Sequence, residues 1–337
     1  MSDHSGASEE IEFVASTEEA GMRLDLLLAA TLEDLSRSRC QGLIREGAVT
    51  VGGATIGEPN YRVKPGDAIT VAIPPPDDPT PLGEAIPLTI LYEDAALIVI
   101  DKPAGLVVHP APGSWTGTLV NALIHHCGTS LSGIGGVRRP GIVHRLDKAT
   151  SGVMVVAKTG AAMRELAAQF ADHGRAGPLQ RDYLALVWGA PSPPAGTIDA
   201  PLGRAPHNRL KQTVRKSGGR RALTHYSTAE RFGGDKSAVS LVRCRLETGR
   251  THQIRVHLAH IGHPLLGDPL YGAGFASKAN TLPEAARQAL DALGRQALHA
   301  TRLAFAHPVT AQTLAFETPP PADMAALIAA LREPAAT

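Results

Sequence analysis

The sequence predicts an α+β protein in two unequal parts, and three observations support this. The 337 residues exceed the length of one typical domain. Residues 74–87 contain six prolines, and proline excludes both a helix and an inner strand there because it lacks a backbone donor. Beyond this stretch the expected strands and helices do not alternate strictly. This favours a mixed, mostly antiparallel sheet with flanking helices over a wound parallel one.

These observations divide the chain into five segments. The opening residues are small, polar and acidic, which is typical of a disordered tail, and the prolines mark a semi-rigid linker. We expect a tail at 1–15, a small α/β domain at 16–73, the linker at 74–87, a larger domain at 88–325 and a C-terminal tail at 326–337.

The small domain is expected to hold two helices followed by short strands. Leu24, Leu27 and Leu28 recur at helical spacing, and a second helix is expected after Ser36. Glycine-containing turns then separate short runs rich in β-branched residues, as in small antiparallel sheets.

The larger domain mixes both kinds of element. Valine-rich stretches predict strands, and apolar positions at i, i+3, i+4 and i+7 predict a helix that Thr159 caps. The expected strands are 88–92, 97–100, 152–157, 183–187 and 239–246, and the expected helices include 163–170 and 251–260.

Composition limits the classes of function. The chain is 43% hydrophobic with a net charge of +1, so it is not a disordered protein, and any nucleic-acid contact must come from local basic clusters. The three cysteines, Cys40, Cys127 and Cys244, have no paired spacing, so we expect no disulfide framework and a cytoplasmic location. No apolar run approaches the ~18 residues of a membrane span, so no membrane partner is expected.

The densest polar cluster is GIVHRLDKATSGVMVVAK at 141–158. Apolar residues flank it, so a loop held between buried strands would present its polar side chains rigidly. Asp147 stands among cations that favour its ionised form, which suits a nucleophile or a base. The alternative is a turn aspartate with solvated neighbours, and spacing alone does not decide between the two.

Three other stretches have a functional and a plainer interpretation. LETGRTHQIRVHLAH at 246–260 is either a phosphate-binding helix opening or a polar helix face. Residues 204–221 carry seven positive charges and no negative one, which suits an RNA backbone or a solvated loop. Tyr183, in RDYLALVWG, is either a core aromatic or a residue that stacks on an extruded base. The histidines between 252 and 263 lack an acidic or cysteine partner at metal-site spacing, so no metal is expected.

Together and in this order, these stretches resemble the motifs of the RluA/RluD family of pseudouridine synthases. The motifs are HRLDKATSG at 144–152, RDYLALVWG at 181–189 and LETGRTHQIRVHLAHIGHPLLGDPLYG at 246–272. RLDLLLA and SRSRCQGLIREGAVTVGG, in the small domain, are similar to the S4 RNA-binding domain that precedes the catalytic domain in the RluD branch. Each motif is weak alone, but the resemblance covers nearly the whole chain.

The resemblance implies roles for individual residues. Asp147 matches the catalytic aspartate, and Arg255 matches the arginine paired with it. Tyr183 matches a tyrosine that lies against the uracil ring and can take up the C5 proton. Arg145 matches an arginine that helps to flip the target base or fills its place in the stack, with His144 beside it in the substrate site. No metal or organic cofactor is implied.

The implied partner is RNA, and the implied enzyme is a monomer. The expected target is ribosomal RNA of the large subunit or its precursor particle, with transfer RNA or several RNAs as alternatives. The residues expected to contact RNA are Arg37, Arg39, Arg45, Arg209, Lys211, Arg215, Lys216, Arg220 and Arg250.

Two rival functions stay open at this stage. One is an RNA-binding or ribosome-assembly factor without a working site, and the other is a hydrolase that uses Asp147 with Glu247. The chain also departs from the family pattern. Ala149 stands where a second acidic residue often follows, and the segment 171–180 is longer and richer in glycine. We expect both departures to affect how loops near the site are held.

Overall fold

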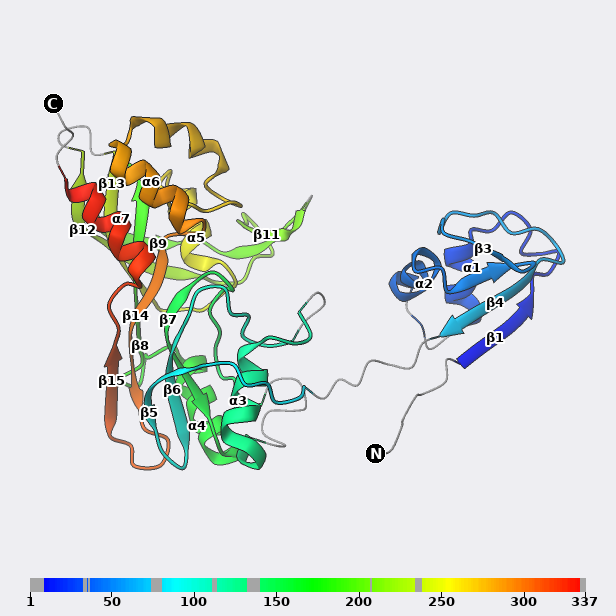
Figure 1. Ribbon diagram of the computed structural model, residues 1–337, viewed down its shortest axis with the longest axis horizontal. Coiled ribbons are helices and arrows are strands. Elements are labelled where there is room, and N and C mark those ends of the chain that lie inside the picture. The colour runs from blue at the N-terminus through cyan, green and yellow to red at the C-terminus, as the bar shows by residue number, and fades with distance from the viewer. Residues whose placement is uncertain are drawn as a thin grey trace. The chain divides into compact units, whose positions relative to one another are not determined.

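The computed structural model divides the chain into two compact units, Met1–Pro79 and Thr80–Thr337 (Figure 1). The residues that the structure describes are 9–32, 35, 37–73, 81–110, 114–131, 140–206, 208–233 and 238–333. The division falls inside the proline-rich stretch, of which residues 74–80 lie outside the described residues.

The first unit is a four-stranded sheet with two helices. Its strand order is β1-β4-β2-β3, and its pairings are antiparallel. The strands are β1 (Glu9–Val14), β2 (Val49–Val51), β3 (Ala54–Thr55) and β4 (Ala68–Ile73), and the helices are α1 (Leu24–Thr31) and α2 (Arg37–Arg45). Apolar side chains of both helices and of the inner strands form one core.

The expectation of a disordered tail over residues 1–15 is wrong for its second half. Residues 9–14 form β1, which pairs with β4 in the register Glu9↔Ile73 to Val14↔Ala68. Ile11 and Phe13 alternate with acidic residues and pack against the core, so the strand buries one face and leaves the other in water.

The second unit is built on a nine-stranded sheet. Its order is β5-β6-β7-β14-β8-β13-β12-β9, with β15 paired to β14. Among the described strands of this sheet, β7 and β14 pair in parallel and the other pairings are antiparallel, which confirms a mixed, mostly antiparallel sheet. The strands are β5 (Thr89–Glu93), β6 (Leu97–Lys102), β7 (Ser151–Ala157), β8 (Gln180–Trp188), β9 (Ala195–Asp199), β12 (Leu223–Phe232), β13 (Val239–Leu246), β14 (Leu298–Ala306) and β15 (Thr313–Glu317).

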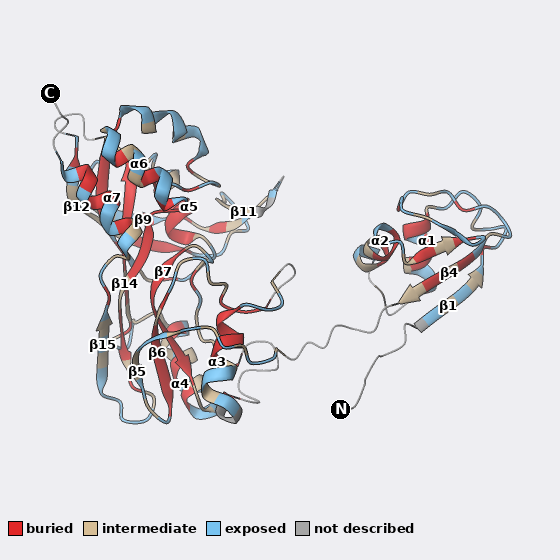
Figure 2. Cartoon of the chain, viewed as in Figure 1, coloured by how far each residue is buried: buried red, intermediate tan, exposed pale blue. Residues whose placement is uncertain are grey.

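Helices cover both faces of this sheet. The α-helices are α3 (Leu119–Cys127), α4 (Gly160–Asp172), α5 (Gln253–His260), α6 (Glu284–Leu293) and α7 (Ala322–Arg332), with short 3₁₀ helices at Gly128–Leu131 and Ala273–Thr281. Residues of β7 alternate between two cores: Met154 and Val156 face α3 and α5, whereas Val153 and Val155 face α4. Every residue of β7 is therefore buried, as the red central strands in Figure 2 show.

A separate hairpin projects from the second unit, formed by β10 (Leu202–Ala205) and β11 (Asn208–Val214). It carries the first part of the basic stretch. The described residues contain no helix that is both long and apolar enough to cross a membrane.

The expectation of a C-terminal tail at 326–337 is also wrong for most of its length. Helix α7 runs to Arg332, and Leu327, Ile328 and Leu331 are buried against α6 and the sheet. Together with Met324 these residues fall at i, i+3, i+4 and i+7, the spacing of one helical face. Residues 334–337 lie outside the described residues.

One buried carboxylate holds the two helices of the first unit together. Asp25, on α1, is fully buried and accepts hydrogen bonds from Arg23, Arg37 and Gln41. Burial alone would raise the pKa of Asp25, but these hydrogen bonds outweigh it and bring the pKa to about 2.

We predict that Asp25→Asn lowers the free energy of unfolding of this unit by about 2 kcal/mol at neutral pH. Because the folded-state pKa lies below the unfolded value of 3.8, the wild-type contribution is present above that value and is lost as the pH falls towards about 2. Hydrogen exchange of residues 9–73 in the full chain measures both effects. Glu46→Gln, an exposed ion-pair variant in the same unit, should change neither, and equal exchange in both variants would contradict the prediction.

Candidate active site

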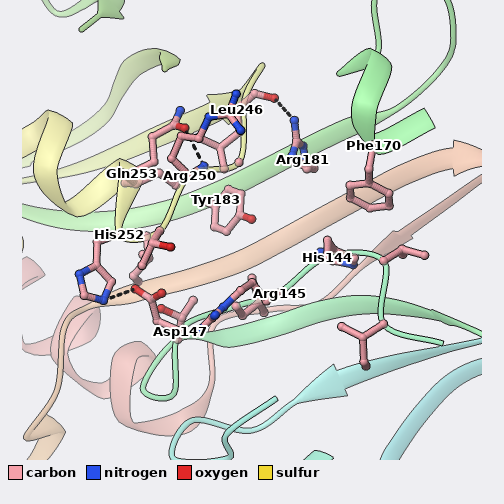
Figure 3. A pocket seen from close by; sticks show the side chains of 18 of the residues that line it. His144, Arg145, Asp147, Phe170, Arg181, Tyr183, Leu246, Arg250, His252 and Gln253 are labelled. Atoms are coloured by element: carbon pink, nitrogen blue, oxygen red, sulfur yellow. Dashed lines mark hydrogen bonds and ion pairs between the residues drawn. The ribbon is translucent and has the colours of Figure 1, made fainter. Parts of the chain in front are cut away.

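A cavity of about 460 Å³ lies in the second unit. Its wall comes from three places: the loop that precedes β7, the first half of β8, and the turn that leads into α5. Helix α4 closes one end with Phe170 (Figure 3). Its volume is typical of small-molecule sites.

The loop before β7 is held through its backbone carbonyls. The Lys148 carbonyl accepts from Gly105 N at 2.8 Å and from Lys102 Nζ at 3.2 Å. The Ala149 carbonyl accepts from Arg295 Nη1 at 3.0 Å. These contacts fix the residues that follow Asp147 without using its side chain.

Lys102 is fully buried under this loop. Besides the Lys148 carbonyl, its ammonium donates to the carbonyls of Pro103 at 2.7 Å and Leu106 at 3.0 Å. Burial lowers the pKa of Lys102 to about 7, and the nearby Asp147 carboxylate opposes that shift. The three carbonyls match the three N–H donors of the charged form.

Gly152, at the end of the HRLDKATSG stretch, has a backbone reason to be glycine. Its φ is 119°, and a Cβ there would overlap the carbonyl of Ala300 on the parallel strand β14. The loop therefore enters the sheet at a point of close backbone approach.

The predicted pair of Asp147 and Arg255 is present. Arg255 Nη1 donates to Asp147 Oδ2 at 3.1 Å, while its Nε and Nη2 donate to the two oxygens of Asp268 at 2.7 and 2.9 Å. The exposed fractions of the side chains are 19% for Asp147, 5% for Arg255 and 0% for Asp268. The exposed end of this row is therefore the carboxylate that faces the cavity.

Asp268 is itself held by backbone donors. It accepts from the amides of Leu270 and Tyr271 at 2.9 and 3.0 Å. Burial would lower the pKa of Arg255, but the two neighbouring carboxylates outweigh it and raise that pKa. The guanidinium therefore stays charged and cannot turn away from Asp147.

Tyr183 lies on β8 and lines the cavity, as does Arg181 two residues earlier on the same face of the strand. Arg181 donates to the carbonyls of Leu246 and Glu247, which ties β8 to the turn before α5. Burial raises the pKa of Tyr183 to about 12. Its hydroxyl is therefore a protonated phenol on a side chain that lines the cavity (Figure 3).

Arg145 and His144 have different surroundings. Arg145 is exposed and lies next to Asp147 at the cavity wall (Figure 3). His144 stacks on Phe170 at 4.4 Å between ring centroids, and its Nε2 accepts from the Val155 amide at 3.2 Å. Burial, assisted by Arg181, lowers the pKa of His144 to about 3, so its ring is neutral. These contacts hold the loop against α4 and β7.

The β10–β11 hairpin of the basic stretch contacts Tyr271, which in turn contacts His252 on the cavity wall. Gln212 N, on β11, donates to the Tyr271 hydroxyl at 2.8 Å, and Lys211 Nζ lies 6.0 Å from the centroid of the Tyr271 ring. Arg250 lines the cavity itself. The other charged side chains that the structure describes in this stretch are exposed or half-buried: Arg204, Arg215, Lys216, Arg220 and Arg221. The side chain of Arg209 lies outside the described residues.

The three arginines of α2 do not share one role. Arg37 is used inside the unit, since its Nε and Nη2 both donate to Asp25. Arg39 pairs with Glu46 at 3.4 Å. Arg45 is exposed at the end of the helix. The expected RNA contact by Arg37 therefore competes with a structural contact, whereas Arg45 remains accessible.

Asp268, Tyr271, Lys102 and Arg295 were not singled out from the sequence, yet all four hold the site. Asp268 and Tyr271 lie in the quoted GDPLYG stretch, so the motif contained the signal without a role for it. Lys102 sits in DKPAG, which reads as an ordinary charged turn.

Two of the histidines between 252 and 263 use ring nitrogens in hydrogen bonds within the protein. Both ring nitrogens of His257 bond to protein groups, the Thr224 hydroxyl and the Ala200 carbonyl, at 2.9 Å each. His263 bonds to the Trp188 carbonyl. The rival carboxylate Glu247 pairs with a histidine, His225, at 2.7 Å and is not among the residues that line the cavity.

The two units match two protein families. A family model described as RNA pseudouridylate synthase matches residues 96–260, and a model of the S4 domain matches residues 22–69. The matched ranges fall in the second and the first unit respectively.

Individual relatives extend the match to nearly the whole chain. The "Ribosomal large subunit pseudouridine synthase D" of Zymomonas mobilis subsp. mobilis is 50% identical over 316 residues, which cover 93% of this chain and 95% of that protein. The "Uncharacterized RNA pseudouridine synthase YlyB" of Bacillus subtilis is 46% identical over 324 residues, which cover 96% and 99%. The solved structure of "Human RNA Pseudouridylate Synthase Domain Containing 4" aligns with a TM-score of 0.54 at 25% identity, over 72% of this chain and 93% of that one. At this identity over nearly the full length of its relatives, the chain belongs to the RNA pseudouridylate synthase family, the isomerases that convert uridine in RNA to pseudouridine.

Proposed function

We propose that this enzyme isomerises specific uridines of large-subunit ribosomal RNA, with Asp147 as the catalytic carboxylate. The observation that carries the catalytic part is the row of Asp147, Arg255 and Asp268, whose one accessible carboxylate faces a cavity beside Tyr183. The ribosomal part is supported by relatives named "Ribosomal large subunit pseudouridine synthase D", from Neisseria meningitidis and Nitrosomonas europaea as well as Zymomonas mobilis. In this proposal the enzyme works in the cytoplasm as a monomer.

The reaction breaks the N1–C1′ bond of uridine, turns the uracil and rejoins it to the ribose through C5. The Asp147 carboxylate attacks C1′ or stabilises the oxocarbenium ion that develops there, as a carboxylate does in glycoside hydrolysis. The electron pair of the broken bond leaves with uracil. When C5 attacks C1′, the carboxylate departs, the C5 proton is lost to a base, and N1 takes up a proton, so that the product is an isomer of uridine. No other reactant is consumed.

Arg255 orients the carboxylate. Because two of its nitrogens are fixed on Asp268, the third points at Asp147 before substrate arrives. Such preorganisation avoids the cost of arranging dipoles during the reaction.

Tyr183 holds the base by its ring. A phenol with a pKa of about 12 is a poor proton acceptor near neutral pH, so we assign it stacking and leave the C5 proton to another acceptor. We assign to Arg145, which is exposed beside Asp147, the role of occupying the gap that the flipped uridine leaves in the RNA. His144 supports this loop from behind.

RNA outside the target nucleotide is expected to contact basic side chains of both units. In the second unit these are Arg250 and the residues of and after the hairpin: Arg204, Arg209, Lys211, Arg215, Lys216 and Arg220. In the first unit Arg45 and Arg39 are the better candidates, since Arg37 is held by Asp25. Their contacts with phosphates would position the RNA without reading its sequence.

The proposed function is tested by mapping pseudouridine in total RNA from cells with and without this enzyme. We predict that sites in large-subunit ribosomal RNA disappear and return with the wild-type protein. Asp147→Asn should fail to restore them, with a loss in purified enzyme on the order of 10³-fold or more, because the amide cannot bear the charge.

Glu247→Gln is the matched control, since it removes a carboxylate that lies outside the cavity wall, and it should restore the sites fully. Conversion by Asp147→Asn at the wild-type rate would refute the assignment of the carboxylate. Loss of sites only in transfer RNA would move the target away from the ribosome. Release of free uracil by the wild type would favour the hydrolase.

The role of Tyr183 predicts a pH profile. Because the phenol stays protonated, the single-turnover rates of wild type and Tyr183→Phe should depend on pH in the same way between about pH 7 and pH 10. Tyr183→Ala, which removes the ring, should be slower on the order of 10- to 100-fold. A rise with pH in the wild type that Tyr183→Phe lacks would show that the hydroxyl acts as a base.

A further inference from the structure

His252 is held in an uncommon conformation at the edge of the cavity. Its φ is 57° and its ψ is 18°, the left-handed region, at the position before α5. Residues other than glycine rarely adopt this backbone conformation, and those that do are often found at functional sites. His252 lines the cavity, and its Nε2 lies 3.9 Å from Asp147 Oδ2 (Figure 3).

Contacts on the other side of the ring decide which nitrogen carries the proton. Nδ1 of His252 lies 2.9 Å from the Tyr271 hydroxyl, and that hydroxyl accepts from the Gln212 amide at 2.8 Å. An amide can only donate, so the hydroxyl oxygen is the acceptor there and its own proton is available to Nδ1. The described residues offer that proton no second acceptor. We assign Nδ1 as the acceptor of the pair, because the hydroxyl proton then has a partner within the protein.

The remaining proton of the neutral ring then lies on Nε2, the nitrogen that faces Asp147. Burial lowers the pKa of His252, with Asp147 opposing the shift, so the ring is neutral near pH 7. At 3.9 Å the Nε2–H is too far from Oδ2 for a hydrogen bond. It is a donor directed into the cavity next to the proposed catalytic carboxylate.

The chemistry of the target nucleotide identifies the acceptor. If Asp147 faces C1′, the nearest ribose oxygens are O4′ and the 2′-hydroxyl. O4′ gains positive charge in the oxocarbenium ion, so a donor there would oppose the reaction. A hydroxyl, by contrast, both accepts and donates, so it can accept from Nε2–H and donate to Asp147 Oδ2 across the gap between them.

We propose that His252 recognises the ribose of the target nucleotide by donating from Nε2 to its 2′-oxygen, with Tyr271 as the positioning residue. This inference rests on the proposed function, because it places C1′ at Asp147. It gives the enzyme a means to distinguish RNA from DNA at the reacting nucleotide. It also connects the basic hairpin to the site, since β11 supplies the amide that sets the donor direction of Tyr271.

The test is a comparison of binding to two short RNAs that differ only at the mapped target position, uridine in one and 2′-deoxyuridine in the other. Binding needs no turnover, so Kd is measured by fluorescence anisotropy. We expect the wild type to prefer the ribo form on the order of tenfold. His252→Ala should bring this ratio close to one by weakening binding of the ribo form only.

Two other variants keep the test decisive. Tyr271→Phe retains the ring against Arg255 but frees the tautomer of His252, so it should lower the ratio by a factor of roughly two to five. His225→Ala removes a histidine outside the cavity wall and should keep the full ratio. Thermal unfolding of each full-length variant reports its folding.

Retention of the full wild-type ratio by His252→Ala, or by Tyr271→Phe where the alanine variant does not fold, would overturn the inference. Failure of the proposed function looks different. In that case Asp147→Asn still converts uridine, whatever the binding ratio of the His252 variants.

Discussion

The site depends on a guanidinium buried between two carboxylates. Taking Arg255 and Asp268 out of water is costly, and only a complete set of short hydrogen bonds recovers that cost. Asp268 meets the condition through Arg255 and two backbone amides. Because the inner carboxylate is fully satisfied, Arg255 has one nitrogen left for Asp147. The Asp147 carboxylate is thereby held in a fixed position at the cavity wall. The desolvation cost falls on Arg255 and Asp268, which lie behind it.

A second constraint acts on the loop rather than on the side chain of Asp147. Two buried basic side chains, Lys102 and Arg295, donate to consecutive carbonyls of the loop, those of Lys148 and Ala149. The two residues are far apart in the sequence. Arg295 is held in turn by a bidentate pair with Asp323 of α7. The acidic partner of Arg295 therefore comes from the C-terminal helix. Helix α7 therefore helps, through Arg295, to hold the loop that precedes β7.

Sequence reasoning was most successful where periodicity is local. The valine-rich strand before α4, the hairpin of β5 and β6 and the helix capped by Thr159 follow from patterns of a few residues. The pairing of Asp147 with Arg255 spans 108 positions, and only the resemblance to a family suggested it. Asp268 and Lys102 were missed because charged residues are usually exposed. Nothing in the neighbouring sequence shows that backbone carbonyls accept from Lys102 or that a guanidinium donates to Asp268. Strand β1 was missed because its acidic outer face hides an apolar inner one.

The hairpin shows how a binding surface can act on a reaction that it does not touch. Its charged side chains suit RNA phosphates, but its link to the site is the uncharged Gln212 amide on Tyr271. The ring of Tyr271 lies 5.1 Å from the Arg255 guanidinium, and its hydroxyl contacts His252. Two neighbours of Asp147, the Arg255 guanidinium and the His252 ring, therefore contact one residue that the hairpin holds. An RNA bound to the hairpin would therefore contact the same element that holds Tyr271 against both neighbours of Asp147.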